Sequence, residues 1–340
     1  MTISKEQEAI INAPIDEKTI VMACAAAGKT FSVTERIRFL LRNGIQPNKI
    51  VAITFTNAAA QEMRERLKDE VSTGMYVGTM HSYANGLLNA NGIDTHLIRE
   101  EEEFDKLFDL IEMNPQVLRP VDYLICDECQ DLDEQQFRFI TNYIDCKGSL
   151  FVGDIRQSIY GFRGANPDCL RFLMADDEYT IRELTENYRN AKAIITFSLS
   201  FLAKMKLPVS NKIKPKRENS GSVIIDPVNF RLGQEIKDIG EYRDWAVLCR
   251  TNYQVAEIMA YLNKHRIPNV TFKQAAGSRE DLRDKMNSNT VKVLTIHSAK
   301  GLEFNNVVVF NKYCKGDKEE ELRLRYVAAT RAKNLLYWIN

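Results

Sequence analysis

The chain has 340 residues, of which 44% are hydrophobic and 27% charged, so it is long enough to form two domains of ordinary size. Basic and acidic residues both number 46, so the net charge does not by itself indicate a nucleic-acid partner. No apolar run approaches the ~20 residues of a membrane-spanning helix, and the N-terminus shows no apolar signal segment. The odd number of cysteines, seven, and the four histidines argue against disulfides and a His/Cys metal site. We therefore expect a soluble cytoplasmic protein.

The first predicted element is a buried strand at residues 19–22, followed by a short loop and a helix that begins near Phe31. The loop ends in Gly28, Lys29 and Thr30, and this order of strand, loop and helix is typical of a phosphate-binding P-loop. Backbone N–H groups and the positive end of the helix would face the phosphates. Lys29 would reach the terminal phosphates and the Thr30 hydroxyl would ligate Mg²⁺. The alternative is an accidental Gly-Lys-Thr after a strand.

The loop itself is unusual, because residues 24–27 include no glycine. A residue with a side chain is strained by about 1 kcal/mol or more where the backbone needs a positive φ. We therefore expect strain in this loop.

A second predicted strand, at residues 121–126, ends in two adjacent carboxylates, Asp127 and Glu128. At the carboxyl end of a strand beside a P-loop, Asp127 would hold the Mg²⁺ shell and Glu128 would orient and deprotonate the attacking water. The alternative is a solvated acidic turn, which the preceding apolar strand disfavours.

A third predicted strand, at residues 149–152, is followed by a dense group of polar and aromatic residues. Gln157 would sense the γ-phosphate, while Tyr160 and Phe162 offer flat faces on which bases can stack. Each of these residues alone is more often ordinary core or surface, but their grouping within residues 153–165 indicates a site.

These segments resemble the UvrD/Rep-like superfamily 1 DNA helicases, in order and over nearly the whole chain. The most specific matches are residues 157–160, 293–304 and 325–332. In chain order, the segments similar to the family's motifs Q, Ia, Ib, II, III, IV, V and VI are residues 4–10, 53–63, 78–82, 127–131, 153–165, 184–189, 293–304 and 325–332.

The resemblance implies roles for individual residues around ATP. Gln7 would read the adenine edge, Tyr188 would stack on adenine, and Glu303 would contact the ribose and phosphate region. Arg189 and Arg331 would be arginine fingers that reach the γ-phosphate from the second domain, because planar guanidinium groups stabilise charge on a transferring phosphoryl group. The loop part of the implied nucleotide site is Ala25, Ala26, Ala27, Gly28, Lys29, Thr30 and Phe31.

Three residues depart from the family pattern. Ala26 stands where the family usually has glycine, which affects P-loop geometry and catalytic rate. Phe31 stands where many relatives carry an arginine, so we expect an aromatic sandwich of Phe31 and Tyr188 around the base; an unchanged KM for ATP in Phe31→Ala would contradict it. Phe162 replaces the usual tryptophan and keeps a stacking face of smaller area.

The predicted fold is α/β, with two RecA-like domains that each have a parallel sheet flanked by helices. Residues 1–183 would form the first domain and residues 184–340 the second, with ATP in the cleft between them. The second half restarts with strands at 245–249, 291–296 and 306–310 and a helix over 254–266. The intervals 83–120 and 268–290 are too short for the family's large inserted subdomains; the first would hold a helix or two and the second a polar connector.

We expect an ATP- and Mg²⁺-dependent translocase or helicase on single-stranded DNA, with 3′ to 5′ direction implied by the resemblance. The reduced insertions favour translocation over strong autonomous unwinding and leave room for an accessory protein. The alternative is a DNA-binding regulatory module with weak or no ATPase activity; a small-molecule kinase would not explain motifs III, V and VI. For His81 and His297, the alternative to a DNA contact is a purely structural role. The expected DNA contacts are Phe55, Asn57, His81, Tyr160, Phe162, Arg163 and His297.

Overall fold

The computed structural model describes residues 3–71, 74–100, 103–205, 207, 212–226, 230–239, 241–272, 279–311 and 318–340, without the side chains of residues 99, 100, 239, 279 and 280. The chain divides into two compact units, Met1–Thr185 and Glu186–Asn340. Within the described parts, no helix has the length and apolar character needed to cross a membrane.

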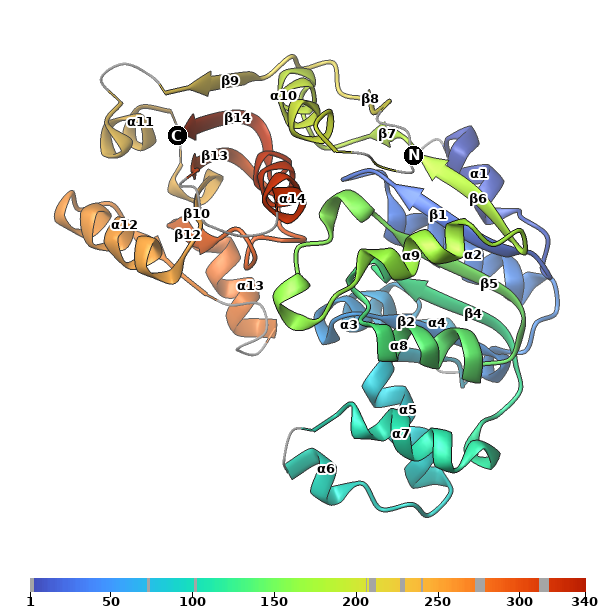
Figure 1. The fold of residues 1–340 in the computed structure, drawn as a ribbon. Coiled ribbons are helices and arrows are strands. Elements are labelled where there is room, and N and C mark those ends of the chain that lie inside the picture. Colours follow the sequence, from blue (N-terminus) through green and yellow to red (C-terminus); the bar gives the residue numbers. More distant parts are fainter. Residues whose placement is uncertain are drawn as a thin grey trace. The chain divides into compact units, whose positions relative to one another are not determined.

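The first unit is built on a six-stranded, all-parallel sheet with the strand order β3-β2-β4-β5-β1-β6. Its central strands are almost entirely buried, as expected when helices cover both faces of a parallel sheet (Figure 1). The strands are β1 (Lys18–Ala23), β2 (Ile50–Thr54), β3 (Tyr76–Thr79), β4 (Val121–Asp127), β5 (Cys146–Gly153) and β6 (Tyr179–Leu184).

The helices of this unit bury one face against the sheet and are capped locally. Helix α2, for example, buries Val33, Ile37 and Leu40, and the Thr56 hydroxyl accepts from Ala59 N–H to start α3. Helices α5, α6 and α7 form a small lobe of their own (Figure 1). The helices are α1 (Lys5–Ile11), α2 (Lys29–Arg42), α3 (Asn57–Arg66), α4 (Lys68–Val71), α5 (Met80–Ala90), α6 (His96–Glu100), α7 (Lys106–Met113), α8 (Glu134–Arg138) and α9 (Pro167–Met174).

The second unit has its own parallel six-stranded sheet, in the order β11-β12-β10-β13-β14-β9, and a two-stranded sheet of β7 and β8. Its core includes the buried side chains of Trp245, Val293 and Val308. Its elements are β7 (Glu186–Asn187), α10 (Lys192–Leu202), β8 (Lys214–Pro215), β9 (Ser222–Ile225), α11 (Leu232–Ile239), β10 (Trp245–Cys249), α12 (Asn252–Lys264), β11 (Asn269–Val270), α13 (Arg279–Asn287), β12 (Val291–Thr295), β13 (Phe304–Phe310), α14 (Lys318–Ala329) and β14 (Ala332–Ile339).

The two α/β units with parallel sheets confirm the predicted fold class, and the predicted strands occur within a few residues of their expected bounds. The prediction of a polar connector at 268–290 was wrong, because this interval contains β11 and α13; residues 273–278 lie outside the described part. The short strand was missed because it consists of only Asn269 and Val270, too few residues to show an apolar pattern.

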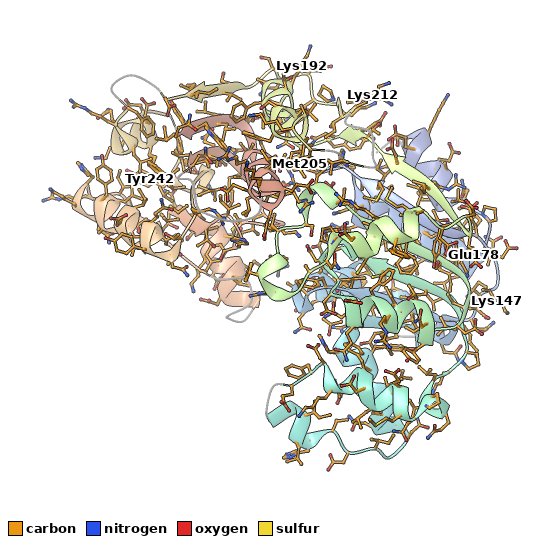
Figure 2. All side chains as sticks on the ribbon, viewed as in Figure 1. Lys147, Glu178, Lys192, Met205, Lys212 and Tyr242 are labelled. Carbon is orange, nitrogen blue, oxygen red and sulfur yellow. The ribbon has the colours of Figure 1, made fainter. Side chains whose placement is uncertain are left out.

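The two ends of the parallel strands in the first sheet carry different residues. Lys147 and Glu178 project at the amino end, where β5 and β6 begin, and their side chains are largely exposed (Figure 2). The predicted functional residues follow the opposite, carboxyl ends of β1, β2, β4 and β5, where parallel α/β sheets bind ligands.

Candidate active site

The P-loop connects β1 to α2 through a backbone with two positive φ angles, 57° at Ala26 and 81° at Gly28. A Cβ atom at Gly28 would also lie 2.7 Å from Gln7 Nε2, so a side chain there would require the Gln7 amide to shift. The expected strain is therefore confirmed, and it falls on Ala26, the position at which the family usually has glycine.

Ala26→Gly is expected to stabilise the first unit by up to about 1 kcal/mol, because glycine adopts positive φ without the steric cost that alanine bears. Ala27→Gly is the matched control. Ala27 has no positive φ, so the same change there should destabilise by about 0.5–1 kcal/mol through added unfolded-state entropy. Urea denaturation of both variants checks the prediction, and shifts of the same sign would contradict it.

Lys29 and Glu128 meet at the base of this loop, with Lys29 Nζ 2.9 Å from Glu128 Oε1. Burial alone would lower the pKa of Lys29, but Glu128, Asp127 and Asp154 outweigh it and raise the pKa. Burial and the neighbouring Glu128 charge raise the pKa of Asp127, while Lys29 opposes them. Glu128 has a φ of 55°, which turns the chain sharply at the end of β4 and places two carboxylates beside one lysine. The pair is thus part of a charged, partly buried site.

A hydrogen-bond chain that the sequence did not reveal continues from Glu128. Gln130 Nε2 donates to Glu128 Oε2 at 2.5 Å, and Gln130 Oε1 accepts from Asp154 N–H at 2.9 Å. The buried Asp154 carboxylate then accepts from Arg156 Nε at 2.6 Å and from Gln157 Nε2 at 2.7 Å. Gln157 is therefore tied to the carboxylate pair through two intermediates, and its action as a γ-phosphate sensor stays a prediction.

Cys126 and Cys129 flank the two carboxylates with Cys-x-x-Cys spacing, a pattern overlooked in the sequence. Both thiols are free and buried, and burial raises both pKa values. Because the reactive form of cysteine is the thiolate, these residues act as core side chains.

Gln7 lies against the P-loop, and its side-chain amide is engaged within the protein. Its Oε1 accepts from Ser4 N–H at 3.1 Å, and its Nε2 donates to Ala27 O at 3.3 Å. Thr30 and Phe31, in the first turn of α2, are both partly exposed. These positions are compatible with nucleotide contacts, but adenine recognition by Gln7 stays a prediction.

In the second unit, Glu303 lies between two cations. Arg189 Nε contacts Glu303 Oε2, and Lys333 Nζ lies 2.6 Å from Glu303 Oε1. Burial would raise the pKa of Glu303, but the two cations outweigh it and lower the pKa. The nearby Tyr188 O–H donates to Glu186 Oε2 at 2.6 Å. Contact of Arg189, Tyr188 and Glu303 with nucleotide stays a prediction.

Arg331 is built into the second unit. It is 2% exposed, and its guanidinium donates to Val327 O at 3.0 Å, Leu302 O at 3.1 Å and Thr330 Oγ1 at 3.1 Å. These bonds hold the chain after β12 against the end of α14. Its role as an arginine finger stays a prediction.

The first unit carries an aromatic cluster formed by Phe55, Tyr160, Phe162 and Arg163. The Phe55 and Tyr160 rings are stacked at 5.8 Å, and the Tyr160 and Phe162 rings meet edge-on at 6.1 Å. The Arg163 guanidinium lies 5.5 Å from the Tyr160 ring centre and 5.6 Å from that of Phe162, which is 65% exposed. With the exposed Asn57 at the start of α3, five of the seven predicted DNA contacts thus lie after β2 and β5.

The two predicted histidine contacts lie in different units. His81 has its Nε2 3.2 Å from Asp105 Oδ1, and its ring packs 5.1 Å from that of Phe108. This arrangement supports the structural alternative for His81, which joins α5 to α7. His297 follows β12 and is partly exposed, and its contact with DNA stays a prediction.

No group of three or more His, Cys, Asp or Glu residues in the described parts is arranged to hold a metal ion. Asp127 and Thr30 offer hard oxygen ligands, and the Asp127–Glu128 pair has more negative charge than Lys29 alone offsets. This donor set fits a magnesium ion that takes its remaining ligands from phosphate and water.

Comparison with known proteins gives two family matches. Residues 3–118 and 106–178 match the UvrD/REP helicase N-terminal domain, and residues 274–340 match the UvrD-like helicase C-terminal domain. The N-terminal match covers slightly more than half of the chain.

Individual relatives share about a quarter of their residues with it. A probable DNA helicase of Mycoplasma pneumoniae is 24% identical, over 99% of this chain and 83% of its own length. The ATP-dependent DNA helicase PcrA of Leuconostoc citreum is 26% identical, over 73% and 47%. The ATP-dependent DNA helicase Rep of Escherichia coli is 23% identical, over 78% and 54%. The matches to PcrA and Rep thus span about half of each relative's length. The order of the motifs, the P-loop beside two carboxylates and both family matches agree: the chain belongs to the UvrD/Rep helicase family.

Proposed function

We propose that this protein is an ATP-dependent motor that moves along single-stranded DNA, in the 3′ to 5′ direction that the family resemblance implies. The observation that carries the proposal is the pairing of Lys29 with Glu128, at 2.9 Å, beside the buried Asp127. A P-loop lysine, a metal-binding carboxylate and a base for water are the parts that ATP hydrolysis needs.

ATP and Mg²⁺ are the proposed cofactors, with Thr30 and Asp127 as protein ligands of the ion. When bound, the ion would neutralise charge on the phosphates. Lys29 would then pair with phosphate oxygens instead of Glu128, and this exchange would free Glu128 to accept a proton from water. Gln130 would keep the Glu128 carboxylate oriented through its 2.5 Å hydrogen bond.

Single-stranded DNA is the proposed track, and the aromatic cluster is its proposed contact on the first unit. Stacking on aromatic faces tolerates any base, as a motor requires.

Phe162→Ala is expected to weaken binding of an oligothymidine by about 5- to 150-fold, since a stacked base contributes about 1–3 kcal/mol. The control is Phe172→Ala on α9, because Phe172 is 78% exposed and lies outside the cluster. Fluorescence anisotropy with a labelled oligonucleotide gives both dissociation constants. Equal affinities of the two variants would exclude Phe162 from the DNA contact.

Translocation is favoured over autonomous unwinding because segments within the aligned relative have no counterpart in this chain. The alignment with the Mycoplasma pneumoniae protein extends over 449 positions, whereas this chain has 340 residues, so more than a hundred positions have no counterpart here. The N-terminal family match is also split, at residues 106–118, within the interval expected to carry a reduced insertion. An accessory protein that supplies unwinding elements is part of the proposal.

The decisive experiment is steady-state ATP hydrolysis by the wild-type protein with and without single-stranded DNA. The motor requires turnover that DNA stimulates. ATP and DNA binding without turnover would instead favour a regulatory module, the alternative supported by the strained Ala26.

A cytoplasmic location belongs to the proposal and is supported by the six described cysteines, all free thiols.

A further inference from the structure

The chain crosses from the first unit to the second at Thr185, since the units are continuous in sequence. Strand β6 ends at Leu184 and β7 begins at Glu186, so Thr185 is the one residue between them. Thr185 is therefore the last residue of the first unit and leads directly into the second.

Thr185 is held by helix α1, from the opposite end of the first unit's sequence. Thr185 N–H donates to Glu6 Oε2 at 2.7 Å, and the Thr185 hydroxyl donates to Glu6 Oε1 at 2.6 Å. Both oxygens of the Glu6 carboxylate thus accept a hydrogen bond from Thr185. Hydrogen bonds to a charged acceptor are stronger than those between neutral groups.

The same helix holds the P-loop through the next residue. Gln7 Nε2 donates to Ala27 O at 3.3 Å, and its Oε1 is fixed by Ser4 N–H in a capping box. The P-loop also contacts the crossing directly, because Cys24 N–H donates to Leu184 O at 2.9 Å. One short, capped helix therefore joins the phosphate-binding loop to the crossing.

We propose that Glu6 is a positioning residue that couples the state of the P-loop to the chain crossing at Thr185. Phosphate binding engages backbone N–H groups of the loop. A shift of Ala27 is then passed through Gln7 to α1, and through Glu6 to Thr185. This inference rests on the proposed function, and it assigns to Glu6 the transmission of nucleotide binding rather than contact with the nucleotide.

Hydrogen exchange of peptides covering residues 22–30 and 182–190, with and without a non-hydrolysable ATP analogue, tests the proposal. In the wild type, the analogue should slow exchange in both peptides. In Glu6→Ala, the P-loop peptide should keep its response, while the crossing peptide should exchange about tenfold faster and lose its response. Glu6→Gln should restore the response, because its amide can accept from Thr185 N–H and donate to the Thr185 hydroxyl. Glu8→Ala is the matched control, since Glu8 is exposed on the same helix.

Kinetics give a second readout. Glu6→Ala should lower the DNA-stimulated kcat by about tenfold with the KM for ATP within about twofold of the wild type. A crossing peptide that responds to the analogue equally in wild type and Glu6→Ala would overturn the coupling and leave the proposed function intact. Absence of protection of the wild-type P-loop peptide would overturn both.

Discussion

Glu128→Gln is expected to lower the DNA-stimulated kcat for ATP hydrolysis by about 10²- to 10⁴-fold, the usual contribution of a general base. An amide cannot accept the proton from the attacking water, whereas the size and shape of the side chain are kept. The φ of 55° at this residue and the contacts with Lys29 and Gln130 place the carboxylate at the carboxyl end of β4.

The same variant is expected to bind ATP at least as tightly as the wild type. In the structure Glu128 is paired with Lys29, so phosphate must compete with a carboxylate for the lysine. Removal of that negative charge ends the competition and also reduces repulsion with the phosphates. A large loss of kcat without a rise in Kd for ATP is therefore the expected result, measured by steady-state hydrolysis and equilibrium binding.

Glu134→Gln is the matched control, because Glu134 is an exposed glutamate on α8. It should keep wild-type turnover. Retention of more than about a tenth of the wild-type kcat in Glu128→Gln would show that another group activates the water.

The parts of the site that could be predicted from the sequence are those encoded by neighbouring residues. The P-loop and the Asp127–Glu128 pair each follow a short apolar strand, and in a parallel sheet the carboxyl ends of strands share one edge. Strands β1 and β4 lie in the same parallel sheet with β5 between them, and Lys29 meets Glu128 at its carboxyl end. Local pattern and sheet polarity were sufficient for this part.

Contacts between residues far apart in the chain were not predictable in this way. Glu6 meets Thr185 across 179 residues, and nothing in either local sequence indicates the partner. The positive φ of Glu128 was also missed, since glutamate has no intrinsic preference for that backbone conformation. The strain at Ala26 was anticipated only because a loop of known geometry lacked its glycine.

A buried arginine is the clearest example of a missed residue with a large expected effect. Arg36 is completely buried within α2. Its Nε donates to the Tyr123 hydroxyl at 3.1 Å, and its two terminal nitrogens donate to the carbonyls of Ile11, Ala13 and Pro14. The guanidinium also lies 5.0 Å from the Tyr123 ring centre. One side chain thus fixes the segment that leads from α1 into β1, and hence the approach to the P-loop.

Arg36→Met is expected to destabilise the first unit by about 3–5 kcal/mol, because it leaves buried carbonyls without donors. This is a large part of the 5–15 kcal/mol of a typical domain. Arg36→Lys should fall between the wild type and Arg36→Met, since an ammonium has three donors and no planar fork. Arg42→Met, at the exposed end of the same helix, should change stability by less than about 1 kcal/mol.

The two tryptophans provide an internal control for this measurement, because Trp245 and Trp338 both lie in the second unit. Tryptophan fluorescence therefore follows unfolding of the second unit, while far-ultraviolet circular dichroism follows both. In Arg36→Met, part of the dichroism change should move to lower urea by about 1–2 M, and the fluorescence transition should stay in place. An unchanged dichroism transition would show that the three carbonyls are stabilised without Arg36. An equal shift of both signals would show that the two units unfold together, so that the approach to the P-loop contributes to the stability of the whole chain.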